Sequence, residues 1–132
     1  MMDLPTIADE VYTFAEYDAI DRTLQSYIDG ARAGDSSLMR KAFIEGAMIR
    51  GTYGGKLVEW TVQAFCEIID KGGPAADLQA QVVTIEWSGS AAMARLEAKN
   101  WRGTRYTDFF VLIRQDGEWK ISSKAFFAHS RA

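Results

Sequence analysis

The sequence contains only one cysteine, Cys66, and one histidine, His129, among its 132 residues. A single cysteine excludes an intrachain disulfide framework and fits a reducing compartment, most simply the cytoplasm. One histidine and one cysteine supply too few nitrogen and sulfur ligands for a zinc site within one chain. We therefore expect no metal site, and we interpret Cys66 as a small core residue.

The sequence also lacks an excess of positive charge and any long apolar run. Its 15 basic and 18 acidic residues give a net charge of −3, whereas a general nucleic-acid binder usually carries a basic stripe. No apolar run approaches the roughly 20 residues that span a bilayer, and the acidic N-terminus lacks the pattern of a signal peptide. The common phosphate-loop, dinucleotide, metalloprotease and hydrolase motifs are absent. We expect no nucleic-acid partner, no membrane association and no cofactor.

The length and the 48% of hydrophobic residues predict one domain over residues 1–132 with a real core. Residues 1–6 are expected to form a loose N-terminal arm, which reaches residue 15 if the first helix begins near Glu16 rather than near Ile7. Apolar residues at steps of three and four predict the helix that ends at Ala33.

The remaining elements follow from caps and turns. Gly34 suits the end of the first helix, Thr61 caps a third helix, and Gly54-Gly55 favours a tight hairpin. The helices precede the long strands, which predicts the α+β class. The predicted helices cover 16–33, 37–43 and 62–72, and the predicted strands cover 48–53, 56–60, 78–87, 91–101, 105–115 and 118–128.

The last two strands flank Asp116-Gly117, a dipeptide that fits a two-residue turn. Such a turn pairs Arg114 with Trp119, Leu112 with Ile121, Phe110 with Ser123 and Asp108 with Ala125, and these residues share one face. We expect that face, and so Asp108, to point toward the helices. A one-residue bulge would reverse the assignment.

The opposite face of this hairpin is also apolar. It carries Phe109, Val111, Ile113, Lys120, Ser122, Lys124 and Phe126. Because large exposed apolar patches are rare on monomers, this pattern predicts a homodimer through Phe109, Val111 and Ile113. The alternative is that long side chains and the N-terminal arm cover this face.

Several motifs in order resemble the nuclear transport factor 2-like superfamily, which includes ketosteroid isomerase and polyketide-cyclase-like proteins. The motifs are Tyr27-Ile28-Asp29-Gly30 with Gly34-Asp35, then Asp108 followed by Asp116-Gly117-x-Trp119-Lys120-Ile121 and Lys124. Over residues 16–128 the chain is most similar to the putative lumazine-binding family. The resemblance implies a cone-shaped, curved antiparallel sheet wrapped around about three N-terminal helices, a ligand pocket at the open end, and dimers through the outer face. Ile44 stands where relatives are expected to carry a histidine.

Asp108 is the candidate catalytic residue. A carboxyl group that faces an apolar interior has a raised pKa and can move a proton next to a carbonyl near neutral pH. The ketosteroid isomerase arrangement, a worked example of this principle, operates in the same superfamily. The alternative is that Asp108 caps a turn or forms an ion pair with Arg95, Lys99 or Lys124.

The other candidate residues would line a ligand pocket. They are Tyr27, Phe43, Arg50, Trp60, Glu97, Trp101 and Phe110. Glu97 lies almost opposite Asp108 if Arg102-Gly103 is a simple two-residue turn, and two such carboxylates would mark a functional site. The Tyr27 hydroxyl would contact a ligand or Asp108. For the aromatic residues the alternative is an ordinary core, and for Arg50 it is a solvated strand position.

These observations predict a protein that binds a small apolar or aromatic molecule in the cone. Two alternatives stay open. One is a cofactor-independent lyase or isomerase that uses Asp108 as general acid or base. The other is a dimeric protein-interaction module whose cone is filled by side chains.

Overall fold

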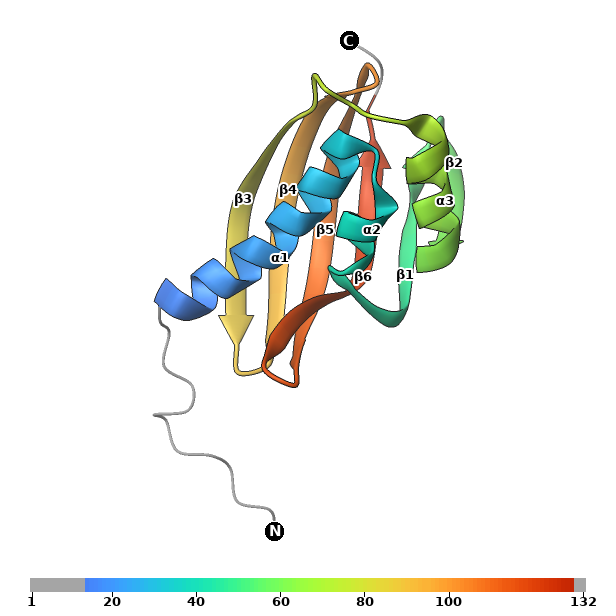
Figure 1. The fold of residues 1–132 in the computed structure, drawn as a ribbon. Helices are drawn as coiled ribbons and strands as arrows, with labels where there is room; N and C mark the ends of the chain where they lie inside the picture. Colours follow the sequence, from blue (N-terminus) through green and yellow to red (C-terminus); the bar gives the residue numbers. More distant parts are fainter. Residues whose placement is uncertain (1–13, 130–132) are drawn as a thin grey trace.

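The computed structural model describes residues 14–129, which form helices on one side of a curved sheet (Figure 1). The predicted α+β class is confirmed. The arm expected at residues 1–6 lies outside the described residues, whereas Phe14 and Ala15 begin the first helix. No helix within residues 14–129 is long and apolar enough to cross a membrane. The elements are α1 (Phe14–Ala33), α2 (Ser36–Arg40), β1 (Phe43–Tyr53), β2 (Lys56–Thr61), α3 (Val62–Gly72), β3 (Gln79–Ser88), β4 (Ala91–Trp101), β5 (Thr104–Gln115) and β6 (Glu118–Ala128).

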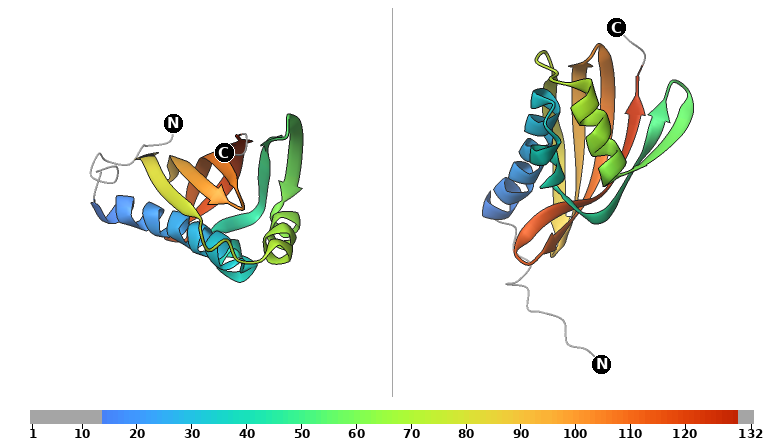
Figure 2. Two further views of the ribbon diagram at one scale, coloured as in Figure 1. Left: turned by 90° about the horizontal axis from the view of Figure 1, so that it is seen from above. Right: turned by 45° about the vertical axis from the view of Figure 1, so that its right-hand side comes forward.

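The six strands form one sheet in the order β2-β1-β6-β5-β4-β3. The predicted meander of four long antiparallel strands, β3 to β6, is confirmed. The predicted small hairpin around Gly54-Gly55 joins this meander through β1, which runs parallel to β6. The sheet is therefore mixed, and it curves around the helices so that they occupy its concave face (Figure 2).

Helix α1 buries the apolar stripe that the sequence predicts. Ile20, Leu24 and Tyr27 are at most 1% exposed and pack in the core beneath the sheet. Gly30 allows α2 to approach, because a Cβ atom there would lie 2.8 Å from the Met39 backbone nitrogen. Gly34 ends the helix with φ of 65°, a conformation that glycine adopts at low cost.

Helix α2 is shorter than predicted. The Asp35 side chain accepts a hydrogen bond from the Ser37 amide as the cap, but the helix ends at Arg40. Phe43, predicted as the last helical residue, instead begins β1 and pairs with Ile121. The predicted start of this strand at Met48 is wrong for the same reason, because pairing with β6 extends the strand toward α2.

The β5–β6 hairpin has the predicted turn but a different register beyond it. Leu112 pairs with Ile121 as expected, and Ser122 then forms a bulge, so that Phe110 pairs with Lys124 and Asp108 with Phe126. The predicted Phe110–Ser123 and Asp108–Ala125 pairs are therefore wrong.

The bulge reverses the faces of β6 but not those of β5. Asp108 points inward as expected and is 0% exposed. Lys124 and Phe126, predicted to face outward, also point inward and are 4% and 7% exposed, whereas Ala125 is exposed. The bulge thus brings a lysine into the interior beside Asp108.

Candidate functional site

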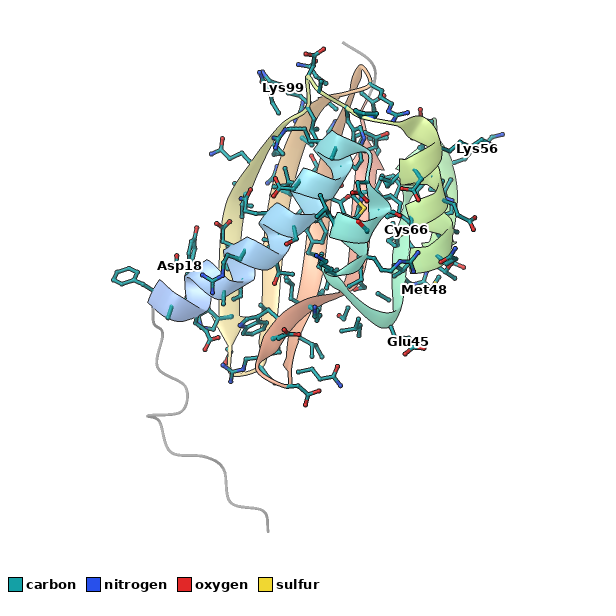
Figure 3. The ribbon with its side chains drawn as sticks, in the orientation of Figure 1. Asp18, Glu45, Met48, Lys56, Cys66 and Lys99 are labelled. Carbon is teal, nitrogen blue, oxygen red and sulfur yellow. The ribbon has the colours of Figure 1, made fainter. Side chains whose placement is uncertain are left out.

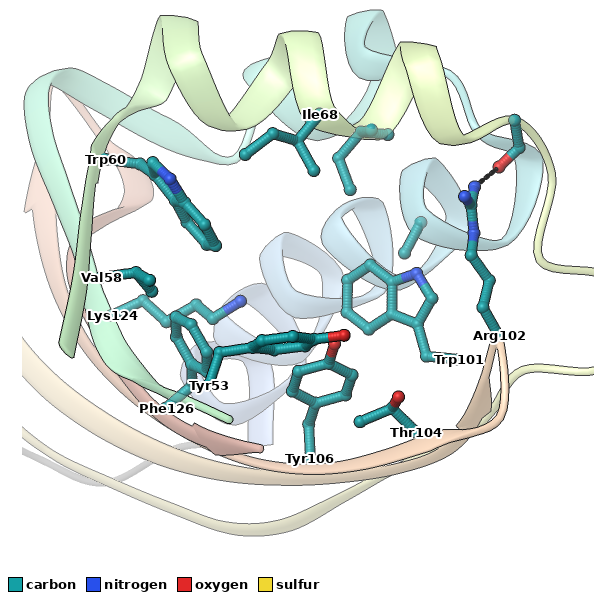
Figure 4. A pocket seen from close by; sticks show the side chains of 13 residues that line it. Tyr53, Val58, Trp60, Ile68, Trp101, Arg102, Thr104, Tyr106, Lys124 and Phe126 are labelled. Carbon is teal, nitrogen blue, oxygen red and sulfur yellow. Dashed lines mark hydrogen bonds between the residues drawn. The ribbon is translucent and has the colours of Figure 1, made fainter. Parts of the chain in front are cut away.

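A cavity of about 360 Å³ opens at the end of the cone between α3 and the concave face of the sheet (Figure 4). Helix α3 forms its roof, the β1–β2 hairpin forms one wall, and the β4–β5 turn forms the opposite wall. The cone is therefore not filled by side chains at this end. The lining residues are Ala31, Tyr53, Val58, Trp60, Ile68, Ile69, Gly73, Trp101, Arg102, Thr104, Tyr106, Lys124 and Phe126.

Aromatic rings make the walls of this cavity rigid and flat. Trp60 stacks on Phe126 with ring centroids 5.7 Å apart, and Trp101 meets Tyr106 edge to face at 5.4 Å. Gly51 makes room for one of these rings, because a Cβ atom at that position would overlap the ring and the carbonyl oxygen of Phe126. Such walls suit a flat, mostly apolar ligand.

Lys124 supplies an amine at the base of the cavity. Its side chain is 3% exposed, and its Nζ lies 4.6 Å from the ring centroid of Phe65 and 4.9 Å from that of Tyr27. The rings of Phe126 and Trp101 lie 5.1 Å and 5.8 Å from the same nitrogen. The amine also donates a hydrogen bond to the Tyr27 hydroxyl. Lys124 thus projects from β6 into an aromatic enclosure (Figure 4).

Asp108 lies behind Lys124 and is fully buried. Its Oδ2 is 3.8 Å from the Lys124 Nζ, and neither carboxyl oxygen has a hydrogen-bond partner among the described residues. Of the three basic partners that the sequence suggested for Asp108, the structure therefore selects Lys124. Asp108 does not itself line the cavity, so any chemistry on a ligand must reach it through Lys124 or Tyr27.

Burial shifts the pKa values of this group toward uncharged forms. It raises the pKa of Asp108, and the positive charge of Lys124 acts in the opposite direction. Burial lowers the pKa of Lys124, opposed by the charge of Asp108. Burial and the charge of Asp108 together raise the pKa of Tyr27 well above 10. Burial thus shifts all three groups in the direction of their uncharged forms.

Arg102 stands at the rim of the cavity. It occupies the β4–β5 turn with φ of 54°, and its guanidinium donates a hydrogen bond to the Gly73 carbonyl oxygen (Figure 4). A side chain on Gly72 would overlap this guanidinium. Among the described lining residues the basic groups are Arg102 and Lys124, and none is acidic, so the site favours ligands that present acceptor oxygens.

The structure brings together some of the residues predicted for the pocket. Trp60 and Trp101 line the cavity. Tyr27, Phe43 and Phe110 lie in the core beneath its floor, where Tyr27 meets Phe110 at 5.1 Å and Phe43 at 6.1 Å between ring centroids. The Tyr27 hydroxyl accepts a hydrogen bond from the Lys124 amine.

Arg50 and Glu97 lie away from the cavity. Arg50 is half exposed and forms an ion pair with Glu59 at 2.5 Å. Glu97 was expected opposite Asp108, but an irregularity between Ala98 and Trp101 places it opposite Thr107 instead. The predicted pair of facing carboxylates is therefore wrong. Ile44, the residue expected to replace a histidine, packs against the core and does not line the cavity.

The sequence reasoning missed Lys124 as a site residue. Lys124 follows Ser122-Ser123, two small polar residues at the bulge, but such residues also occur in regular strands. The cavity residues of the β1–β2 hairpin and of α3 carried no polar signal that separates them from core residues. No cluster of three or more metal-ligating side chains occurs among residues 14–129.

Comparison with known proteins is consistent with this geometry. A family model described as "Putative lumazine-binding" matches residues 15–127. A nuclear transport factor 2-like protein of unknown function from Methylobacillus flagellatus KT is 32% identical, with a TM-score of 0.86 over 90% of this chain and 96% of that one. A second such protein, from Shewanella baltica OS155, is 34% identical, with a TM-score of 0.85 over 91% and 99% of the two chains. These structures confirm the predicted nuclear transport factor 2-like fold.

A curated relative carries an enzymatic name. "Aldolase FrzH" from Cladobotryum sp is 27% identical over 120 residues, which cover 90% of this chain and 96% of the relative. A ketosteroid isomerase-like protein from Erwinia carotovora atroseptica SCRI1043 shares the fold at 14% identity, with a TM-score of 0.69 over 89% of this chain and 99% of that one.

Proposed function

The chain belongs to the putative lumazine-binding family, and from that premise we propose that it binds a small, flat, mostly apolar molecule in the cavity beneath α3. The observation that carries this proposal is an open cavity of about 360 Å³ between tryptophan, tyrosine and phenylalanine rings. That volume lies in the range of about 300–1,000 Å³ that is usual for small-molecule sites. A bound ring would contact Trp60 and Trp101, and its acceptor oxygen would meet the Lys124 amine.

Binding is testable with a ring compound and two tryptophan variants. Lumazine, the pteridine that gives the family its name, is one probe, and 2-naphthalenemethanol is a second that tests shape alone. We expect calorimetric titration to show that at least one probe binds about tenfold more weakly to Trp60→Ala, because an aromatic contact contributes about 0.5–1.5 kcal/mol beyond the area it buries. Trp87→Ala is the matched control, because Trp87 does not line the cavity. Equal affinity in the two variants would place the ligand elsewhere, and native mass spectrometry of the purified protein would reveal any retained molecule.

A second candidate function is a cofactor-independent lyase or isomerase in which Asp108 acts as general acid or base. The buried Asp108–Lys124 pair supports it, as does the aldolase name of the relative. Asp108 is not placed as a simple base would be, because Lys124 lines the cavity and Asp108 lies behind it. Catalysis predicts that 2-acetylnaphthalene exchanges its methyl protons for deuterium in the presence of the protein. Asp108→Asn should slow this exchange at least about tenfold, and exchange unaffected by that substitution would contradict a role for Asp108.

We also propose a homodimer through the outer face of the sheet. Phe109, Val111 and Ile113 are 47%, 49% and 41% exposed and form an apolar stripe along β5. A second copy of the chain would bury this stripe. Light scattering should show that Val111→Asp lowers the molecular mass to that of a monomer, whereas Leu57→Asp, on the β2 strand, leaves it unchanged. A monomeric wild-type protein would contradict the proposal.

The cytoplasm is the proposed location. The buried free thiol of Cys66 supports it, because such a residue suits a reducing compartment. Recovery of the native protein in the periplasmic or secreted fraction of its source cells would contradict it.

A further inference from the structure

We propose that Lys124 is a nucleophile that forms an imine with a carbonyl compound, and that the ligand of this cavity is an aldehyde or ketone with an apolar, aromatic body. The inference rests on the proposed binding site, because it assigns a ligand class and a chemical step to the same cavity. Lys124 is the one amine among the described residues that line this cavity. It approaches the cavity from its base, where a bound carbonyl group would meet it (Figure 4).

The geometry of the Asp108–Lys124 pair differs from that of a structural ion pair. A buried ion pair offsets the loss of hydration only when close hydrogen bonds satisfy both partners. Here the nearest carboxyl oxygen lies 3.8 Å from the amine, beyond hydrogen-bond distance, and both oxygens lack partners among the described residues. The one hydrogen bond of the amine goes to the Tyr27 hydroxyl, which is itself neutral. This arrangement keeps the amine available for another partner.

The surroundings of Lys124 also favour the reactive form of the amine. Only a neutral amine attacks a carbonyl carbon, and removal from water is one way that proteins obtain a neutral lysine near neutral pH. Burial lowers the pKa of Lys124, as described above. The described titratable groups that face the amine are Asp108 and Tyr27, and no second cation lies beside it in the aromatic enclosure.

The chemical step balances with the groups present. The Nζ lone pair attacks the carbonyl carbon, the carbon–oxygen π electrons move to oxygen, and that oxygen gains a proton as the nitrogen loses one, which yields a carbinolamine. The Asp108 carboxyl, in its protonated form, then protonates the hydroxyl group through the Tyr27 hydroxyl. The carbon–oxygen bond breaks, water leaves, and the nitrogen lone pair forms the carbon–nitrogen double bond. The iminium proton returns to Asp108, so that amine and carbonyl compound become imine and water.

The shape of the cavity sets the class of carbonyl compound. Its walls are mostly apolar, with the rings of Trp60, Trp101 and Phe126 and the aliphatic side chains of Val58 and Ile68. The polar lining groups are few, namely the hydroxyl groups of Tyr53, Thr104 and Tyr106 with Arg102 and Lys124 (Figure 4). Such a surface fits an aromatic or alicyclic body with one or two polar groups better than a sugar, because each buried hydroxyl group of a sugar needs a hydrogen-bond partner.

A first experiment measures the reactivity of Lys124 with a probe small enough to enter any open cavity. The intact protein is treated with formaldehyde and sodium cyanoborohydride at pH 7, and methylation of each lysine is followed by peptide mass spectrometry. Lys56 and Lys99 are the internal controls, because both are exposed and project into solvent (Figure 3). We expect Lys124 to react at least about tenfold faster than either control, because burial lowers the pKa of its amine. If Lys124 reacts more slowly than the controls, and this difference in rate disappears when the protein is unfolded in urea, Lys124 belongs to a structural ion pair and the proposal is overturned.

A second experiment separates imine formation from ligand binding. The protein is incubated with 2-naphthaldehyde and cyanoborohydride, and 2-naphthalenemethanol serves as the matched compound without a carbonyl group. The expected result is a stable naphthylmethyl adduct on Lys124 that is absent from Lys124→Arg and unchanged in Lys56→Arg. Binding of the alcohol without an adduct on Lys124 would overturn the imine step and leave the binding proposal standing. If formaldehyde methylates Lys124 rapidly but neither naphthalene compound binds, Lys124 is still a nucleophile. The proposal that the ligand has an apolar, aromatic body is then overturned.

Discussion

Asp108 and Glu97 lie on neighbouring strands, one step apart in register and on opposite faces of the sheet. Glu97, on the outer face, accepts hydrogen bonds from Thr107 at 2.9 Å, from Arg95 at 3.1 Å and from Arg105 at 3.3 Å. Asp108, on the inner face, is fully buried beside one amine at 3.8 Å and has no hydrogen bond among the described residues.

The two carboxyl groups differ in their effect on the stability of the folded state. Glu97 remains partly hydrated and well bonded, so it needs no functional explanation. Asp108 is buried without close partners, an arrangement that disfavours its charged form and does not by itself stabilise the protein. Perturbed ionisable groups of this kind are concentrated at functional sites. The contrast supports placing the chemistry at the inner face, around Asp108 and Lys124.

The largest expected effect comes from removing each carboxyl group separately. We expect Asp108→Ala to lower the free energy of unfolding by about 3 kcal/mol, because it removes the carboxyl group beside the buried Lys124 amine and opens a void in the core. Glu97→Ala should lower it by less than about 1 kcal/mol, as is usual for partly exposed ion pairs. Urea denaturation of both variants measures the difference. Equal losses would remove the distinction between the two faces.

A smaller effect of opposite sign is expected when both members of the inner pair are replaced. Asp108→Leu combined with Lys124→Met should unfold with a free energy equal to the wild type or about 1 kcal/mol higher, because apolar side chains need no hydration or pairing. The same variant should lose all adduct formation with 2-naphthaldehyde. A loss of stability equal to the sum of the losses in Asp108→Leu and Lys124→Met would show that the two side chains stabilise the fold independently, and would contradict the expected result.

The smallest expected effect is the pH dependence of stability, which should have opposite signs at the two sites. The raised pKa of Asp108 means that above pH 3.8 the native state binds more protons than the unfolded state, so its contribution to stability falls as pH rises. Partial burial acts to raise the pKa of Glu97, but hydrogen bonds from Thr107 and two arginines outweigh it, and the pKa lies below 4.5. The contribution of Glu97 is therefore present above pH 4.5 and is lost as pH falls.

Urea denaturation between pH 3 and pH 8 checks both signs against neutral variants. The stability of the wild type relative to Asp108→Asn should decrease from about pH 4 upward, whereas its stability relative to Glu97→Gln should decrease from about pH 4.5 downward. Parallel curves for the two variants would show that burial does not shift Asp108 as described.

Elements with a strong local signal were predicted from the sequence. Three such elements are confirmed by the structure. The spacing of apolar residues predicts the helix that buries Ile20, Leu24 and Tyr27. The residue types preferred at caps and turns predict the Thr61 cap and the Asp116-Gly117 turn. The inward direction of Asp108 was also predicted, because β5 itself is regular. By contrast, the start of β1 at Phe43 depends on parallel pairing with β6, a contact between segments almost 80 residues apart in sequence.

The candidate site was predicted only in part. Trp60 and Trp101 line the cavity as predicted. The predicted Glu97–Asp108 pair required a regular β4–β5 register, and an irregularity between Ala98 and Trp101 shifts that register by one residue. Lys124 was assigned to the wrong face because an uninterrupted alternation was extended through Ser122. Neither irregularity has a unique local signature, since serine, lysine and asparagine all occur in regular strands.

By itself, the sequence determined the α+β class, the meander of four strands after the last helix, the closing hairpin and the buried position of Asp108. These features depend on periodicity and turn chemistry, which act over a few neighbouring residues. Only the tertiary structure decided that Lys124 joins Asp108 inside the cone, and that α3 and the β1–β2 hairpin leave a cavity above them. The physical reason is that side chains alternate along a strand with a period of two, so one extra residue at Ser122 turns every later side chain to the other face.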